Sequence, residues 1–301
     1  MPSIPRFILA LALAAACGAA HAALGVFATV PEWAALSQEL GGDKVRVYCA
    51  TSPLQDPHHV QARPSLIARA RTADLVVATG AELEVGWLPL VLQQAGNDKV
   101  QPGSPGYFEA TSVVALLGKP TRLDRAEGDV HPQGDPHIQG DPRNVARVAA
   151  ALSQRLQQLD PADAAYFQSR YRDFSSRWNA AIAKWEQEAA PLKGVPIVVQ
   201  HKGFTYLEAW LGLKEVAALE PKPGMEPTTS HLAEVLATLQ RQPAKMVVHA
   251  AYQSDQASEW LGERAKIRVV MLPFTVGGTD GAKDLFGFYQ DTIERLLKGA
   301  A

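Results

Sequence analysis

Three histidines of this sequence have the setting of metal ligands. His58 lies in an Asp-Pro-His-His motif shortly after the apolar run Val45–Cys49, and His201 directly follows the apolar run 195–200. His137 ends a Gly-Asp-Pro-His motif. Loops at the carboxyl ends of strands are where open α/β folds bind their ligands. Three neutral imidazoles that meet there would supply most of a zinc site, so a site formed by these histidines is the working hypothesis.

The other histidines outside the N-terminal segment leave alternatives open. From the residues alone, either His58 or its neighbour His59 could be a plain loop residue, whereas His231, at the start of a helix, is expected to be structural. His131 shares a loop with His137 and is either a first contact for incoming metal or a solvated loop residue. His249 ends a strand and is either a core residue with one hydrogen bond or a reserve ligand.

The N-terminal residues 1–22 have the pattern of a signal peptide. Arg6 precedes an apolar stretch of residues 7–16, which is too short to span a bilayer at about 20 residues. Small residues then lead to a cleavage position after Ala22, so export to a bacterial periplasm is expected. The alternative is a lipid anchor at Cys17, although the leucine of such a motif falls one position too early.

Composition bounds the class of protein. The chain has 301 residues, 47% of them hydrophobic, which is enough for a sizeable core and two domains of ordinary size. A net charge of -2 and a pI of about 6.5 give no reason to expect nucleic acid or an anionic membrane surface as partner. After cleavage only Cys49 remains, so no internal disulfide can form, and this thiol is expected to be a buried apolar residue.

Short apolar runs alternate with amphipathic ones, which indicates parallel sheets covered by helices. The expected strands are 24–29, 45–49, 75–78, 111–116, 197–200, 215–219, 246–249 and 267–272. The expected helices are 33–40, 64–73, 87–94, 142–158, 161–190, 205–211, 230–240, 253–263 and 283–297. The helix 161–190 carries one long apolar stripe. We therefore expect an α/β fold with an N-terminal lobe (23–160), a single long linking helix (161–190) and a C-terminal lobe (191–301).

Blocks of residues along nearly the whole mature chain match one family, in order. They are Asp56-Pro57-His58 with Pro64-Ser65, Ala73 to Val77 with Gly80 to Glu84, Gly128 to Pro132 with Asp135-Pro136-His137 and Asp141-Pro142, His201-Lys202 with Phe204 and Tyr206, Glu220 to Gly224 with His231-Leu232, and Leu272-Pro273 with Val276 to Gly278. The chain thereby resembles the periplasmic solute-binding proteins of bacterial zinc and manganese ABC importers, most closely the zinc type.

The resemblance implies two α/β lobes with a metal cleft between them and no catalytic activity. It implies that His58, His137 and His201 bind a divalent transition metal, which an importer permease in the inner membrane receives from a monomeric carrier. It also makes His59 the exposed neighbour of His58. A direct register of the family pattern places Thr275 at the position of the fourth ligand, but a threonine would be a poor zinc ligand. We therefore expect the fourth ligand to be Asp280, the nearest carboxylate in the same Gly-rich loop after the last strand. The alternatives are Asp284, which a helix cap explains better, and His249.

Imidazole-rich ligand sets favour zinc over manganese, which prefers oxygen ligands, so Zn²⁺ is the expected cargo and Mn²⁺ the alternative. A secreted zinc hydrolase is the main rival, but the sequence holds neither a His-Glu-x-x-His nor a Gly-x-Ser-x-Gly motif. A cleft for a chelated metal or haem would be roomier and more aromatic. Because the loop around His131 is short and poor in histidine, a partner metallochaperone is also considered. Glu82, Glu84 and Trp87 are either groups that orient the ligands or, in the case of the glutamates, plain loop charges.

Overall fold

The computed structural model describes residues 22–120 and 131–301. The expected signal segment up to His21, the alternative lipid-anchor site Cys17 and the start of the Gly128 to Pro132 motif lie outside the described residues. None of the helices in the described ranges combines the length and apolar character that a bilayer crossing requires.

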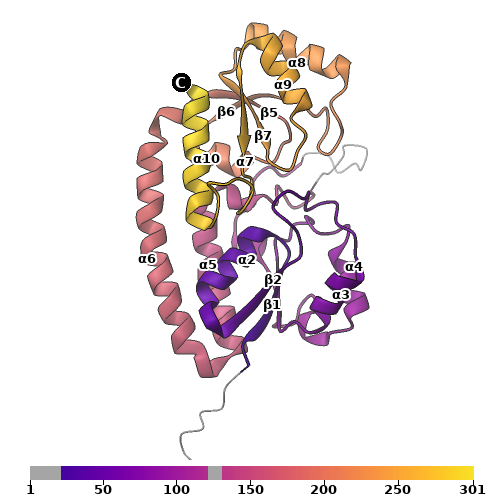
Figure 1. Cartoon of the computed structure of the whole chain (residues 1–301), viewed down its shortest axis with the longest axis vertical. Helices are drawn as coiled ribbons and strands as arrows, with labels where there is room; N and C mark the ends of the chain where they lie inside the picture. The colour runs from indigo at the N-terminus through magenta and orange to yellow at the C-terminus, as the bar shows by residue number, and fades with distance from the viewer. Residues whose placement is uncertain (1–21, 121–130) are drawn as a thin grey trace, which may run out of the picture.

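The first lobe is built on a parallel sheet of four strands in the order β2-β1-β3-β4 (Figure 1). Its strands are β1 (Leu24–Ala28), β2 (Val45–Cys49), β3 (Leu75–Ala78) and β4 (Tyr107–Glu109), and the connecting helices are α2 (Pro31–Gly41), α3 (Pro64–Arg71) and α4 (Leu88–Ala95). Each of these helices has proline in its first turn, where the missing N–H costs little.

The second lobe repeats this topology, with strand order β6-β5-β7-β8. Its strands are β5 (Pro196–Val199), β6 (Lys214–Ala218), β7 (Met246–Ala250) and β8 (Arg268–Leu272), and its helices are α7 (Thr205–Leu211), α8 (Thr229–Arg241) and α9 (Gln256–Ala265). In both sheets all neighbouring strands are parallel. The predicted α/β fold with two parallel sheets is therefore confirmed. Loops at the carboxyl ends of both sheets face the space between the lobes (Figure 1).

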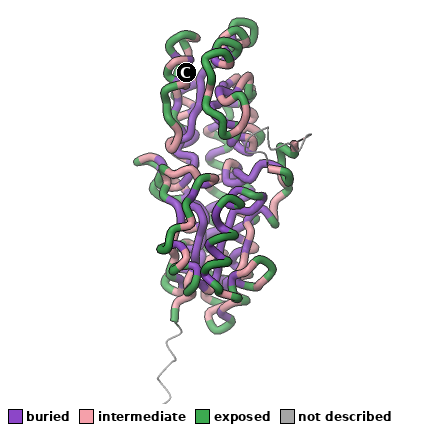
Figure 2. The backbone as a smooth tube through the Cα atoms, turned by 90° about the vertical axis from the view of Figure 1, so that its right-hand side faces the viewer, coloured by how far each residue is buried: buried purple, intermediate pink, exposed green. Residues whose placement is uncertain are grey.

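Three further helices hold the lobes together: α5 (Pro142–Leu159), α6 (Ala164–Glu188) and α10 (Leu285–Ala300). The long helix α6 runs beside both lobes (Figure 1), as the apolar stripe predicted. Its buried Trp178 packs edge-on against Phe286 and Tyr289 of α10, with ring centres 4.9 and 5.4 Å apart. Figure 2 shows buried backbone running through both halves of the molecule, and one core cluster includes β1, β5 and α6 residues.

Short 3₁₀ turns connect these elements. They cover Gly42–Lys44, Asp98–Val100, Ala110–Val113, Ile138–Gly140, Pro161–Asp163 and Ala190–Leu192.

The strand expected at 111–116 is wrong. The fourth strand is Tyr107–Glu109. The first residues of the expected strand belong instead to the 3₁₀ turn Ala110–Val113. The neighbouring strand β3 ends at Ala78, whose register partner is Glu109. Beyond that pair the backbone N–H of Thr111 still donates to the Thr79 carbonyl at 2.9 Å, but both strands have ended. The later residues of the run lie beside no strand in the described part of the chain, so their β propensity has no ladder in which to act.

Cys49, at the end of β2, was expected to be buried, but the structure shows it only half-buried. Its Sγ donates to the carbonyl of Thr51 at 3.1 Å. Burial raises the pKa of the thiol to about 11, so it stays protonated at neutral pH. A protonated thiol is a poor nucleophile and a poor metal ligand.

Candidate metal centre

The structure brings His58, His137 and His201 together between the two lobes. His58 lies in the loop after β2, His137 in the loop before α5, and His201 in the loop after β5. The ring centres are 5.4 Å apart for His58 and His137, 6.0 Å for His58 and His201, and 5.9 Å for His137 and His201. His58 and His201, which are 143 positions apart in the sequence, thus lie close together in the folded chain.

A carboxylate is bonded to the Nδ1 atom of each of these rings. Asp56 Oδ1 lies 2.8 Å from Nδ1 of His58, and Asp135 Oδ1 lies 2.7 Å from Nδ1 of His137. Glu220 Oε2 lies 2.8 Å from Nδ1 of His201. An ionised carboxylate accepts only, so Nδ1 carries the hydrogen and each neutral ring presents the lone pair of Nε2. This is the usual arrangement of metal-binding histidines.

Two of these pairs form within an Asp-Pro-His motif. The Asp56 carboxylate also accepts the backbone N–H of His58 at 2.9 Å, and that of Asp135 accepts the backbone N–H of His137 at 2.8 Å. Such local turns are typical of aspartate two residues before the donor. Each motif therefore orients its own imidazole, and the repetition of Asp-Pro-His was the sequence signal for this role.

Burial and the carboxylates act on the protonation states in opposite directions. Burial lowers the pKa of His137 and outweighs Asp135. Burial also lowers the pKa of His201, but the hydrogen bond and charge of Glu220, with more distant carboxylates, leave that pKa raised. Although burial raises the pKa of Asp56 and Asp135, their bonded histidines bring both down to about 2. Both aspartates are therefore anions that accept hydrogen bonds.

A fourth imidazole, that of His131, joins the group. Its Nε2 lies 3.3 Å from Nε2 of His58, and its ring centre is 5.3 Å from that of His58 and 6.3 Å from that of His137. Burial lowers the pKa of His131 to about 3, helped by the other two histidines. The ring is therefore neutral and largely enclosed, and it is not the solvated loop residue that the sequence left open.

Both lobes contribute residues that hold the ligand loops. Trp87 donates from Nε1 to the Pro57 carbonyl at 3.0 Å, beside His58. Tyr206 of α7 donates to the Asp135 carbonyl at 2.8 Å. Trp87 thus positions the His58 loop through its backbone, whereas the second lobe positions the His137 loop.

The glutamates considered beside Trp87 act elsewhere. The Glu84 carboxylate is buried and accepts from the Thr29 hydroxyl at 2.6 Å and from the backbone N–H of Thr79 at 2.7 Å. It orients strand ends of the first sheet and is neither a loop charge nor a partner of the imidazoles in any hydrogen bond described. Glu82 is exposed.

Gly203 is a close-approach position next to the site. A Cβ there would lie 3.0 Å from Cδ2 of His201 and 3.2 Å from the Phe274 ring. Phe274 packs against His137, with ring centres 5.2 Å apart. The glycine therefore lets two loops close around the imidazoles.

The expected fourth ligand, Asp280, is exposed on the loop between β8 and α10. Within residues 22–120 and 131–301, no hydrogen bond or ion pair joins its carboxylate to an imidazole. Thr275 is buried and donates to Glu32 Oε2 at 2.5 Å. Asp284 accepts the backbone N–H of Gly287 at 2.8 Å and caps α10, as the sequence predicted. His249 is buried in β7, with Nδ1 3.2 Å from the Ala250 carbonyl oxygen.

The imidazoles are slightly wider apart than metal ligands. In the part of the chain that the structure describes, no three His, Cys, Asp or Glu side chains lie close enough together to hold an ion as they stand. Zinc bonds to imidazole nitrogen at about 2.0–2.1 Å, which places the centres of two tetrahedrally arranged rings roughly 5 Å apart. The ring centres of His58, His137 and His201, 5.4–6.0 Å apart, therefore need only a small inward movement. Nε2 of His137 is buried without a hydrogen-bond partner, as an imidazole lone pair that awaits a ligand would be.

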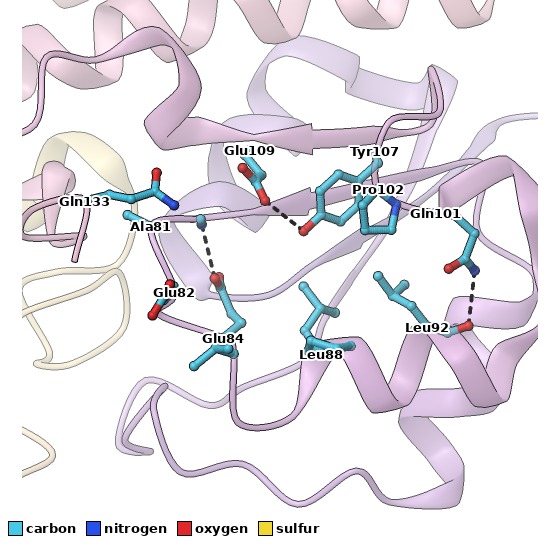
Figure 3. A pocket seen from close by; sticks show the side chains of 13 residues that line it. Ala81, Glu82, Glu84, Leu88, Leu92, Gln101, Pro102, Tyr107, Glu109 and Gln133 are labelled. Atoms are coloured by element: carbon cyan, nitrogen blue, oxygen red, sulfur yellow. Dashed lines mark hydrogen bonds between the residues drawn. The ribbon is translucent and has the colours of Figure 1, made fainter. Parts of the chain in front are cut away.

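Of two large cavities, one is lined by residues of this centre and the other is not. One, of about 520 Å³, opens the site to solvent between the lobes and is lined by His58, His201 and Glu220 among others. The other, of about 420 Å³, lies within the first lobe beside Leu88 and Tyr107 (Figure 3). Its lining has no histidine or cysteine, and the Tyr107 hydroxyl is already bonded to Glu109 at 3.1 Å. The second cavity therefore lacks the nitrogen ligands found at the first.

The sequence model of one protein family covers this chain almost end to end. It is described as the periplasmic component A of the zinc-uptake complex, and it matches residues 26–299. The chain belongs to this family. All four clustered histidines and the three bonded carboxylates fall within the matched range. The resemblance inferred from the motifs is confirmed.

Curated and solved relatives of the zinc-uptake family are distant in sequence. The zinc-binding lipoprotein AdcA of Streptococcus pneumoniae is 22% identical over 240 residues, which cover 78% of this chain but 47% of AdcA, so the chain spans about half of that relative's length. The manganese ABC transporter substrate-binding lipoprotein PsaA of Streptococcus anginosus is 21% identical over 288 residues, which cover 92% of this chain and 89% of PsaA. A crystal structure of ZnuA superposes with a TM-score of 0.77 at 21% identity, covering 93% of this chain and 100% of the other, and shows the shared fold.

Proposed function

We propose that this protein captures zinc in the periplasm and delivers it to an ABC importer. The observation that carries the proposal is the convergence of His58, His137 and His201, each with Nδ1 bonded to a carboxylate. That arrangement leaves three Nε2 lone pairs to share one cation. Proteins in the same family named for zinc or manganese binding support the transport role.

Zinc is favoured over manganese by the atoms that the site offers. Within the described residues, the carboxylates bonded to these imidazoles are those of Asp56, Asp135 and Glu220, and each accepts a hydrogen bond from a ring nitrogen. Their role is to orient nitrogen ligands. Manganese prefers oxygen ligands, whereas imidazole suits zinc and also copper and nickel, so the supply of metal completes the selectivity.

The ligands come from both lobes, and this suits capture and release. His58 and His137 belong to the proposed first lobe (23–160) and His201 to the proposed second lobe (191–301), with 161–190 as the linking helix. A cation between them favours the closed arrangement, and contact with the permease would separate them. We expect a monomer that works after removal of residues 1–22, with a metallochaperone as a further source of zinc.

A zinc hydrolase is the weaker alternative. It would require an open coordination position beside a carboxylate or imidazole free to act as general base. Asp56, Asp135 and Glu220 are each bonded to an imidazole Nδ1, so proton abstraction by any of them would break the bond that orients a ligand. The protein is therefore proposed to bind and release its metal without a reaction.

The proposal is tested by competition of metal-stripped protein with a chelator of known zinc affinity. Wild type should bind one zinc per chain, more tightly than manganese. His201→Ala should lower zinc affinity by about 100-fold or more, since loss of even an outer hydrogen-bond partner costs about 10–100-fold. His59→Ala, an exposed histidine next to the site, is the matched control and should keep wild-type affinity. Wild-type protein that binds no zinc, or that binds it equally well as His201→Ala, would refute the proposal.

A further inference from the structure

The fourth ligand of the proposed zinc site is the question that the family resemblance left open. Within the described residues, His131 is the candidate for that position whose ring contacts the other histidines. We propose that Nε2 of His131 is the fourth ligand of the captured ion and completes a shell of four imidazoles. This inference rests on the proposed function, and it replaces the carboxylate of Asp280 that the sequence suggested.

The distance between the two Nε2 atoms supports this assignment. Nε2 of His131 and Nε2 of His58 are 3.3 Å apart. Two nitrogens at opposite ends of a tetrahedron edge around zinc are about 3.3–3.4 Å apart for bonds of 2.0–2.1 Å. A hydrogen bond between nitrogen and its acceptor is commonly nearer 2.9–3.0 Å. The pair therefore has the spacing of two ligands of one ion.

The loop geometry directs His131 toward the site. Gly134 donates its backbone N–H to the His131 carbonyl at 3.0 Å, and Asp135 donates its own to the Leu117 carbonyl at 2.8 Å. Gly134 has φ of 124°, and a Cβ there would lie 2.6 Å from the Leu117 carbonyl oxygen. Only glycine allows this close approach, which brings the turn that carries His131 against the first lobe.

A strained turn lines the same cavity as Gln133, which lies two residues after His131. Ala81 and Glu82 have left-handed φ values of 48° and 67°. Nδ1 of His131 is itself buried, and it has no hydrogen-bond partner among the described residues. In the tautomer with the hydrogen on Nδ1, Nε2 of His131 is the ligand atom, and this is the atom that faces Nε2 of His58. Backbone strain of this kind gathers at ligand-binding sites.

The rival residues are engaged elsewhere or lie apart. Thr275 donates to Glu32, Asp284 caps α10, and Nδ1 of His249 lies near its own strand's carbonyl. Asp280 is exposed, and in the part of the chain described here nothing connects it with an imidazole. His131, by contrast, contacts both His58 and His137.

A shell of four imidazoles has a consequence for selectivity. With oxygen ligands absent from the shell, manganese loses the donor type that it prefers, whereas zinc does not. The carboxylates of Asp56, Asp135 and Glu220 remain outside the shell and supply negative charge that offsets the cation. His131 would thus favour zinc over manganese at this site.

The test counts imidazoles as well as measuring affinity. Zinc X-ray absorption of the wild type should show four imidazole ligands, and His131→Ala should show three, with an oxygen ligand that lacks the outer-ring scattering of an imidazole in the fourth place. Zinc affinity should fall by about 100-fold in His131→Ala. Asp280→Ala and His59→Ala should match the wild type in both measurements. His131→Asp should recover part of the zinc affinity and raise the affinity for manganese relative to zinc.

The outcomes separate this inference from the proposed function. If His131→Ala keeps wild-type affinity and ligand count, or if Asp280→Ala loses a ligand, His131 is not the fourth ligand, yet the three-histidine site stands. If the wild type binds no zinc, the proposed function fails first. Circular dichroism of each metal-stripped variant shows whether an affinity loss reflects misfolding, and His131→Asp, with its expected partial recovery, provides an independent result.

Discussion

The hydroxyl of Thr275 donates a hydrogen bond of 2.5 Å to the carboxylate of Glu32. The bond joins the loop after β8 in the second lobe to α2 in the first, across 243 positions of sequence. Burial raises the pKa of Glu32 to about 7, against the opposing effect of this hydrogen bond. The carboxyl group is thus partly protonated at neutral pH, and it links the lobes beside the metal centre.

Glu32→Gln should make the metal-stripped protein more stable at pH 8. The folded-state pKa of about 7 lies above the reference value of 4.5, so the folded state holds a proton that the unfolded state releases. Stability therefore falls as pH rises from 4.5 through 7, by about 3 kcal/mol in all. Glutamine retains an acceptor for Thr275 and removes this loss. Urea unfolding at pH 5 and pH 8 measures the free energy of unfolding of the wild type and of Glu32→Gln. An equal pH dependence in these two proteins would contradict the role assigned to Glu32.

Glu220→Gln should weaken zinc binding at pH 8. The Glu220 carboxylate bonds Nδ1 of His201 at 2.8 Å and also accepts the backbone N–H of Gly224 at 2.8 Å. Loss of the Glu220 charge makes the His201 imidazole a less basic metal ligand and loosens the orientation of its ring. Zinc affinity should therefore fall by about 10–100-fold. Glu226→Gln, an exposed glutamate on the same loop, is the matched control. Chelator competition should separate the two variants; identical affinities would exclude Glu220 as a positioning residue.

The same residues show how far sequence reasoning reached at the site. Asp56 and Asp135 stand two positions before their histidines, so the motifs located both loops, but they did not predict that these carboxylates bind Nδ1. Glu220 lies 19 positions from His201, and only the packing of two loops brings them together. His131 was considered only as a first contact or a solvated residue, because the path of its loop depends on the turn at Gly134.

Zinc affinity should fall as the solution becomes more acidic. Neutral imidazole is the ligand form, and the raised pKa of His201 makes it an early site of proton competition, whereas His137 and His131 have lowered pKa values. Affinity should therefore decline as the pH falls through the range in which His201 is protonated, which lies above the ordinary histidine value of about 6.5, by about tenfold per pH unit for one competing proton. Chelator competition from pH 8 to pH 5 measures the slope. A constant affinity over that range would contradict the imidazole site.

Zinc should stabilise the folded protein, because its ligands come from both lobes. At a free zinc concentration of 100 times Kd the gain is about 2.7 kcal/mol. Calorimetric unfolding with and without zinc measures this, and His201→Ala at the same zinc concentration should lose most of the gain. Stabilisation that persists in His58→Ala, His137→Ala and His201→Ala alike would indicate binding at another place.

The fold was more predictable than the site, for physical reasons. The apolar runs Val45–Cys49 and Leu75–Ala78 are strands because both are short, rich in β-branched residues and flanked by turns. The run 111–116 has the same composition but lies beside no strand among residues 22–120 and 131–301, and composition cannot reveal that absence. The stripe of α6 indicated one long buried helix, since its spacing of three and four is independent of the rest of the chain.

The most direct test of the central claim is a crystal structure of zinc-loaded protein with anomalous data at the zinc edge. The account predicts one strong peak between the lobes, about 2.0–2.1 Å from Nε2 of His58, His137 and His201. Their Nδ1 atoms should remain bonded to Asp56, Asp135 and Glu220. A zinc peak away from these three rings, or crystals that take up zinc nowhere between the lobes, would contradict it.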